Sequence, residues 1–125
     1  MNQPSYFEIQ SIDVARAASF YRHVFGWTID KDPAIPIDYW RIETAGIRGA
    51  ILQRPVPAPP GAAGTNAYVV SMEVGNFDET AARVLQSGGR VAMDKFAVPG
   101  KCWQGYFIDI DGNTFGIFEV DTSAA

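Results

Sequence analysis

A chain of 125 residues, nearly half of them apolar, is long enough to bury the core of one ordinary domain. The formal net charge of −4 argues against a nucleic-acid partner, because phosphate-binding surfaces need clustered Lys and Arg. The single cysteine, Cys102, excludes an internal disulfide and a multi-cysteine zinc site. No apolar run approaches the roughly 20 residues that span a bilayer, and the first residues lack a secretory-signal pattern. We therefore expect a cytoplasmic protein without membrane contact.

The first half of the chain predicts one helix and four strands. Asp13 is a suitable N-cap for a helix whose apolar residues recur at helical spacing until Gly26. The glycine of Ala45-Gly46 predicts a tight turn between two strands of a hairpin. The predicted strands occupy residues 6–12, 27–30, 37–44 and 47–54.

The second half repeats this order after a segment rich in Pro and Gly, residues 55–66, which we interpret as a linker. Asn76 and Glu79 form a capping-box pattern at the start of a second helix, which Gly88-Gly89 ends. Asp111-Gly112-Asn113 predicts the turn of a second hairpin. Residues 94–101 are predicted as a loop, and the strands occupy residues 68–74, 90–93, 102–110 and 114–120.

Matching features of the two halves lie at nearly constant separations, which indicates a duplication. The helix starts Asp13 and Asn76 lie 63 residues apart, and the turn glycines Gly46 and Gly112 lie 66 apart. We predict an α+β fold with two βαβββ modules, about residues 5–54 and about 67–121, within a single domain covering 1–125. Two curved sheets that face each other would form a cup or half-barrel for a ligand.

The chain resembles the vicinal oxygen chelate superfamily, which includes glyoxalase I, bleomycin resistance proteins and extradiol dioxygenases. The matching pieces are Ala18-Ser-Phe-Tyr-Arg-His-Val-Phe-Gly-Trp27, the Gly88-Gly89 helix end, and Asp109-Ile-Asp-Gly-Asn-Thr-Phe-Gly-Ile-Phe-Glu119. The resemblance covers nearly the whole chain. It implies the two-module fold but no single activity, because this superfamily supports isomerases, lyases, oxygenases and plain binding proteins.

The resemblance also implies four metal-ligand positions, on the first and last strand of each module. Counted from the matching motifs, they fall on Tyr6, Ala50, Val69 and Gly116. None supplies the imidazole, carboxylate or thiolate that a divalent ion needs, so we expect no metal and no cofactor. The small residues at two of these positions would let a ligand sit deeper. His23, the only histidine, is interpreted as a surface residue of the first helix.

Strand alternation points to a set of candidate pocket residues. Glu8 is the functional candidate, because burial in an apolar cup would raise its pKa and suit it to a cationic ligand or to general-base work. The structural alternative is that Glu8 forms an ion pair with Arg41 or Arg54. Glu119 is interpreted as structural. The candidate ligand-binding residues are Tyr6, Glu8, Trp40, Arg41, Leu52, Ser71, Trp103, Tyr106 and Phe118; alternation leaves the face of those on the third strands open.

These observations favour a metal-free small-molecule-binding protein with an unidentified ligand. The alternative is an enzyme of the same superfamily, a lyase, isomerase or dioxygenase, which uses a metal bound elsewhere or Glu8 as acid and base. A third hypothesis is an interaction module without a small ligand. Because unpaired sheet edges remain in either arrangement of the modules, we also expect a homodimer.

Overall fold

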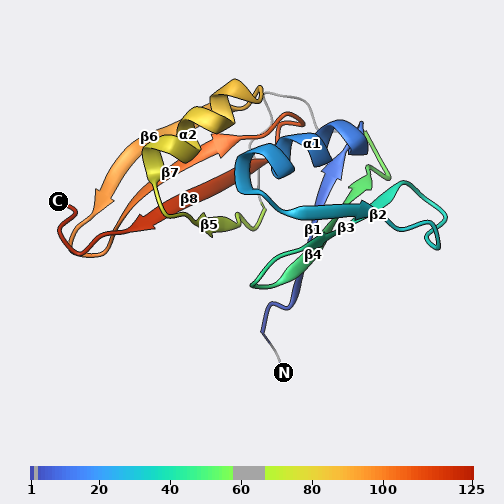
Figure 1. The fold of residues 1–125 in the computed structure, drawn as a ribbon, viewed down its shortest axis with the longest axis horizontal. Coiled ribbons are helices and arrows are strands. Elements are labelled where there is room, and N and C mark those ends of the chain that lie inside the picture. Colours follow the sequence, from blue (N-terminus) through green and yellow to red (C-terminus); the bar gives the residue numbers. More distant parts are fainter. Residues whose placement is uncertain (2, 58–66) are drawn as a thin grey trace. The chain divides into compact units, whose positions relative to one another are not determined.

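The computed structural model describes residues 1, 3–57 and 67–125. The chain divides into two compact units, residues 1–64 and 65–125. Each unit contains a four-stranded sheet and one helix in the same order, strand, helix and three strands (Figure 1). The α+β class with two βαβββ modules, predicted from the sequence, is therefore confirmed.

In the first unit, the strand order is β1-β4-β3-β2, and the first strand runs parallel to the last. Asp13 caps the helix as predicted, since its carboxylate accepts from the Arg16 amide at 3.1 Å. The capped amide would otherwise have no partner within the helix. The elements of this unit are β1 (Tyr6–Ser11), α1 (Val14–Phe25), β2 (Thr28–Lys31), β3 (Tyr39–Glu43) and β4 (Arg48–Gln53).

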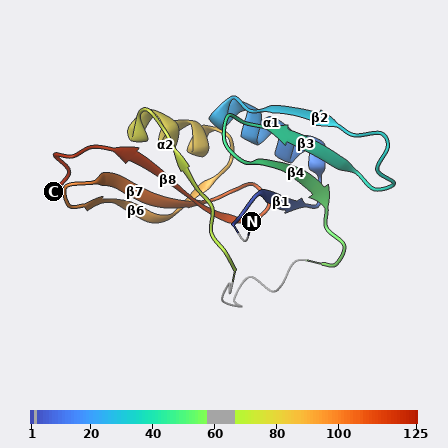
Figure 2. The same ribbon diagram turned by 90° about the horizontal axis from the view of Figure 1, so that it is seen from below.

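The second unit repeats this topology with the order β5-β8-β7-β6, and its helix α2 lies on one side of the sheet (Figure 2). The Asn76 side chain accepts from the Glu79 amide at 3.0 Å, as the capping pattern predicted. The elements of this unit are β5 (Ser71–Glu73), α2 (Phe77–Gln86), β6 (Arg90–Val98), β7 (Cys102–Ile108) and β8 (Thr114–Val120).

The turn between β7 and β8 is organised by a buried carboxylate. Gly112 adopts a φ of 84°, which a side chain would disfavour. Asp109 is 3% exposed, and one of its oxygens accepts from the amides of Asp111 and Asn113, both at 2.8 Å. These bonds satisfy backbone donors that the turn takes out of the sheet. The sequence analysis identified the glycine of this turn but not the role of Asp109.

One predicted loop is a strand instead. Residues 94–101 were expected to form a loop, yet β6 continues to Val98 and only residues 99–101 turn. The pairing register with β7 shifts between Met93 and Phe96, so the polar pair Asp94-Lys95 is accommodated in a bulge. The apolar run Phe96-Ala-Val98 can then pair beyond it. Part of the predicted linker, residues 58–66, lies outside the described residues.

Candidate functional site

Each sheet has one face covered by its helix and one face turned away from it. In the first unit, the guanidinium of Arg22 on α1 lies 5.5 Å from the centre of the Trp40 ring, so Trp40 is on the helix-covered face. Residues paired directly across strands share a face, and neighbours along a strand alternate. Since Ile51 pairs with Trp40, the next residues Ala50 and Leu52 belong to the opposite face.

That opposite face, which we call the open face of the first sheet, carries a chain of hydrogen-bonded polar side chains. Arg41 donates from Nη1 to the Tyr6 hydroxyl at 3.1 Å, and the hydroxyls of Tyr6 and Tyr39 lie 2.8 Å apart. Tyr39 in turn donates to Oε2 of Glu8 at 2.9 Å. On its other side Arg41 donates from Nε to Asp32 at 2.9 Å. Five residues from three segments are thereby linked, which we call the open-face network.

The open-face network shifts the pKa values of three of its members, and it raises that of Arg41 mainly through the hydrogen bond to Asp32. Partial burial, together with the bonds to Tyr6 and Glu8, raises the pKa of Tyr39 well above its ordinary value of 10.0. The hydrogen bond from Arg41 lowers the pKa of Asp32 below its ordinary 3.8, and the amide of Ala34 adds to that effect. At neutral pH Tyr39 is therefore protonated, and the carboxylate of Asp32 is ionised beside the guanidinium of Arg41.

The structural alternative for Glu8, an ion pair with Arg41 or Arg54, is not what the geometry shows. Arg41 pairs with Asp32, and Nε of Arg54 donates to the carbonyl of Val56 at 3.3 Å. Glu8 itself is exposed and receives the Tyr39 hydroxyl. Its hydrogen-bond partner is a phenol hydroxyl on the open face, not the apolar cup wall expected from the sequence.

The open face of the second sheet is less charged. A Cβ at Gly105 would stand 2.6 Å from the Phe77 ring of α2, so Gly105 faces the helix and its neighbours Gln104 and Tyr106 face away. Tyr106 pairs with Gly116, which pairs with Ser71, so these three share the open face. Phe118, paired with Gln104, joins them and is half-buried.

The space beside Gly116 is occupied by the ends of two polar side chains. A Cβ built there would lie 2.3 Å from Oγ of Ser71 and 2.9 Å from Nε2 of Gln104. Those two side-chain atoms approach each other to 3.5 Å over the glycine. The space that a longer side chain would use is already filled by polar groups of the same face.

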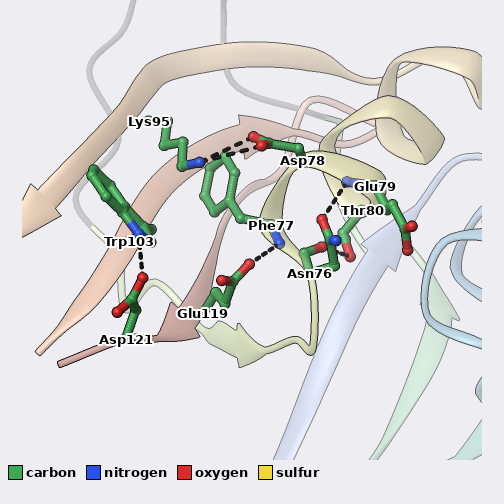
Figure 3. Close-up of polar contacts among 9 residues, drawn as sticks. All are labelled: Asn76, Phe77, Asp78, Glu79, Thr80, Lys95, Trp103, Glu119 and Asp121. Atoms are coloured by element: carbon green, nitrogen blue, oxygen red, sulfur yellow. Dashed lines mark hydrogen bonds and ion pairs between the residues drawn. The ribbon is translucent and has the colours of Figure 1, made fainter. Parts of the chain in front are cut away.

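Trp103 lies on the helix-covered side of the second sheet, in a cluster shown in Figure 3. The ammonium of Lys95, carried by the bulge of β6, stands 4.8 Å from the centre of the Trp103 ring and 5.3 Å from that of Phe77. Lys95 also pairs with Asp78 at 3.2 Å. The indole N–H of Trp103 donates to Asp121 at 3.0 Å. These contacts attach the first turn of α2 to the sheet.

Glu119 has the structural role expected for it. Its Oε1 accepts from the backbone amide of Phe77, the first residue of α2, at 2.6 Å (Figure 3). A carboxylate at this position satisfies an amide without a partner in the helix and complements the positive end of the helix dipole. His23 is exposed, as expected for a surface residue of α1.

Four positions correspond to the metal ligands of the metal-dependent enzymes that the chain resembles. In both units these positions lack the donor groups of a metal site. Ala50 pairs with Glu8 across the strands, and Gly116 pairs with Ser71. Together the four positions contribute one phenol oxygen, from Tyr6, and no carboxylate, imidazole or thiolate. Within residues 1, 3–57 and 67–125, no three His, Cys, Asp or Glu side chains are grouped to hold a metal ion.

Of the nine candidate ligand-binding residues, seven are on the open faces and two are not. Trp40 and Trp103 face the helices, which alternation alone could not decide. Two members of the open-face network, Tyr39 and Asp32, were not among the residues predicted from the sequence. Tyr39 could have been found once Trp40 was assigned to the helix side, because it is two residues from Arg41. Asp32 lies after β2 in a segment with no periodicity, so no sequence signal pointed to it. The seven on the open faces are Tyr6, Glu8, Arg41, Leu52, Ser71, Tyr106 and Phe118.

A hollow of about 780 Å³ opens at one end of the first sheet. It is bounded by the residues that lead into β1 and by the hairpin between β3 and β4. Tyr6 and Arg41 of the open-face network reach its wall, together with Arg48 and Glu43. The lining comprises residues 3–6, 41–43 and 46–49.

Two βαβββ units with a parallel first and last strand define the glyoxalase-like fold, and the comparison with known families agrees. The model of the Glyoxalase/Bleomycin resistance protein/Dioxygenase superfamily matches residues 3–117. The chain belongs to this superfamily, and the resemblance seen in its sequence motifs is confirmed.

Individual relatives are distant. "Putative glyoxylase CFP32" of Mycobacterium tuberculosis is 26% identical over 123 residues, which is 94% of this chain and 46% of that protein. The chain thus spans about half the length of this curated relative. The structure of a hypothetical protein from S. aureus has a TM-score of 0.74 at 20% identity, covering 95% of this chain and 98% of the other.

Two further structures show the same fold. A glyoxalase/bleomycin resistance protein/dioxygenase family enzyme from Burkholderia phytofirmans PsJN has a TM-score of 0.75 at 16% identity, covering 94% of this chain and 98% of that one. A fosfomycin resistance protein from Listeria monocytogenes has a TM-score of 0.73 at 15% identity, covering 97% and 95%. In the described part of the present chain, neither helix has the length and apolar character to cross a bilayer.

Proposed function

We propose that this chain is a metal-free small-molecule-binding protein of its superfamily, with the open face of the first sheet as its principal recognition surface. The observation that carries the proposal is the open-face network. It holds the exposed carboxylate of Glu8 through the Tyr39 hydroxyl, which is linked through Tyr6 to the guanidinium of Arg41. The candidate contact residues are Tyr6, Glu8, Arg41 and Leu52 on the first sheet and Ser71, Tyr106 and Phe118 on the second.

The direction of the hydrogen bonds indicates what kind of group Glu8 would bind. A hydroxyl has one proton, and Tyr39 uses its proton on Glu8. Tyr6 must then donate to Tyr39 and accept from Arg41. Every proton in the chain points toward Glu8, whose remaining lone pairs can only accept. The face therefore favours a ligand with an N–H or ammonium group, held by a charge-assisted bond.

The metal-free part of the proposal is supported by the donor chemistry of the superfamily positions. Ala50 and Gly116 carry no donor atom, and the space at Gly116 is filled by Ser71 and Gln104. The residues present do not fit a divalent ion there, so no step of the proposed function passes through one. Metal analysis of the purified protein tests this directly. A stoichiometric divalent ion bound to the folded chain would refute it.

The binding role is tested by neutralising Glu8. Glu8→Gln keeps the size and one acceptor but removes the charge, and we expect about tenfold weaker binding of organic cations, equal to roughly 1.4 kcal/mol. The assay is calorimetric titration with organic cations, each paired with a neutral isostere. Glu79→Gln is the matched control, because it removes an exposed carboxylate from the first turn of α2. Equal affinities for Glu8→Gln and the control would refute the anchor role of Glu8.

A second candidate function is acid–base catalysis by the same residues. The chain from Glu8 through Tyr39 to Tyr6 provides a continuous path along which a proton can move between a carboxylate and an exposed phenol. This would suit an isomerase or lyase of the superfamily. Solvent-deuterium exchange into a bound ligand, lost in Glu8→Gln and Tyr39→Phe alike, would favour the enzyme over the binding protein.

We also propose that the protein acts as a homodimer in the cytoplasm. Each sheet has two edge strands, β1 and β2 in one and β5 and β6 in the other, which can pair with a second chain. Light scattering after size-exclusion chromatography tests the mass. A monomer at micromolar and higher concentrations would contradict the proposal.

A further inference from the structure

The hollow at the end of the first sheet carries two arginine side chains on one concave wall. Its wall carries two guanidinium groups, from Arg41 and Arg48, against one carboxylate, from Glu43. The complete chain has a formal net charge of −4. Asp32, which pairs with Arg41 from outside the wall, brings the carboxylates to two, so anion binding here depends on the N–H donors that the two ion pairs leave free.

Both guanidinium groups are already paired, but by contacts that a ligand can replace. Arg48 meets Glu43 at 3.1 Å, with 71% and 54% of the two side chains exposed. Arg41 meets Asp32 at 2.9 Å, with 47% and 22% exposed. Solvent-exposed ion pairs contribute little net stability, so exchanging one acceptor for another costs little.

The geometry of these pairs leaves donors for a second acceptor. A guanidinium has five N–H donors in a planar fork. The ion pairs use Nε of each arginine, and Arg41 uses one further N–H, on Nη1, for Tyr6. Terminal N–H groups of two arginines on one wall match the oxygens of a carboxylate or phosphate, which arginine binds in bidentate fashion.

The rest of the wall suits an organic body attached to such a group. Pro4 and Ile47 provide apolar surface, and Gln3 and Ser5 provide amide and hydroxyl groups. A hollow of about 780 Å³ is large enough for a molecule of metabolite size. A bare inorganic ion would use only the arginine end.

We propose that this hollow is a binding site for a small organic anion, whose carboxylate or phosphate group is held by Arg41 and Arg48. Glu8 is not part of its wall, whereas Tyr6 and Arg41 belong both to the wall and to the open-face network. Arg48 belongs to the hollow alone, so the two proposals can fail independently.

The test is an NMR titration of isotope-labelled protein with inorganic phosphate, phenyl phosphate, formate and benzoate at low salt. We expect shifts concentrated at residues 3–6 and 46–49 and at the side-chain Nε of both arginines. Phenyl phosphate and benzoate should each bind about three- to tenfold more tightly than their bare ions, phosphate and formate, because only they use the apolar wall. The comparison of phenyl phosphate with benzoate decides between the two acid groups.

Charge variants at Arg48 and Glu43 are expected to change the affinity for the anion in opposite directions. Arg48→Gln should weaken binding of phenyl phosphate or benzoate about three- to tenfold, and Glu43→Gln should strengthen it by removing the competing carboxylate. Arg90→Gln, which removes an exposed arginine at the start of β6, is the matched control for net charge. Shifts spread over the surface, or equal effects of Arg48→Gln and Arg90→Gln, would overturn the proposal.

Discussion

Removing the hydroxyl of Tyr39 tests whether the open-face network exists in solution. This oxygen lies 2.8 Å from the Tyr6 hydroxyl and donates to Glu8 at 2.9 Å. Tyr39→Phe deletes both bonds and leaves the aromatic ring, so packing is nearly unchanged. Glu8 loses its donor, and Tyr6 loses its acceptor.

The magnitude follows from the two bonds. A bond between neutral groups contributes about 0.5–1.5 kcal/mol, and one to a charged group about 1.5–3 kcal/mol when buried. Glu8 and Tyr6 are exposed, so water replaces part of each loss. We expect the free energy of unfolding to fall by about 1–2 kcal/mol.

Urea unfolding followed by circular dichroism measures this change, with Tyr106→Phe as the control. Tyr106 is on β7, the strand that corresponds to β3, and its ring stacks on Phe96 at 6.4 Å. A double-mutant cycle of Tyr39→Phe with Glu8→Gln should show a coupling of at least about 0.5 kcal/mol. A loss below about 0.3 kcal/mol, equal to that of the control, would refute the network.

Three further changes probe other features of the chain. Gly49→Ala should destabilise the first unit by about 2 kcal/mol or more in urea unfolding, because the new Cβ would lie 2.6 Å from the Phe7 carbonyl oxygen. Gly46→Ala is the control and should be nearly neutral, because its Cβ would lie 3.8 Å from the nearest atom, Oγ1 of Thr44. Glu119→Ala should cost about 1–2 kcal/mol in the same assay and expose the first amides of α2 to hydrogen exchange, whereas an unchanged exchange rate at Phe77 would contradict its capping role. The hydrogen bonds from Ser123 and Trp103 lower the pKa of Asp121. The contribution of Asp121 to stability is therefore present above the ordinary pKa of 3.8 and is lost as the pH falls below that value. The NMR signal of the Trp103 indole N–H should shift in that acid range and should stay fixed in Asp121→Asn.

The helices and hairpins were predictable because their signals are local. Asp13 and Asn76 cap helices through amides three residues away, and Gly112 meets the φ of a tight turn. The 63-residue spacing of the helix starts indicated the duplicated topology without any tertiary information. The superfamily followed from motifs within these same local elements.

The length of β6 was not predictable in this way. Asp94-Lys95 interrupts the apolar pattern, and only the bulge against β7 lets the strand continue. The bulge also places Lys95 over two aromatic rings of distant segments. A local pattern cannot show that a polar pair will be accommodated by the neighbouring strand.

The sequence by itself therefore determined the order of elements, their caps and turns, the duplication and the superfamily. Only the tertiary structure decided which faces Trp40 and Trp103 occupy and that Tyr39 joins Tyr6, Arg41 and Glu8. The physical reason is that alternation along a strand divides residues into two sets but does not say which set the helix covers. The bond between Tyr39 and Glu8 spans 31 residues, so it exists only after the parallel pairing of β1 with β4 brings both strands into one sheet.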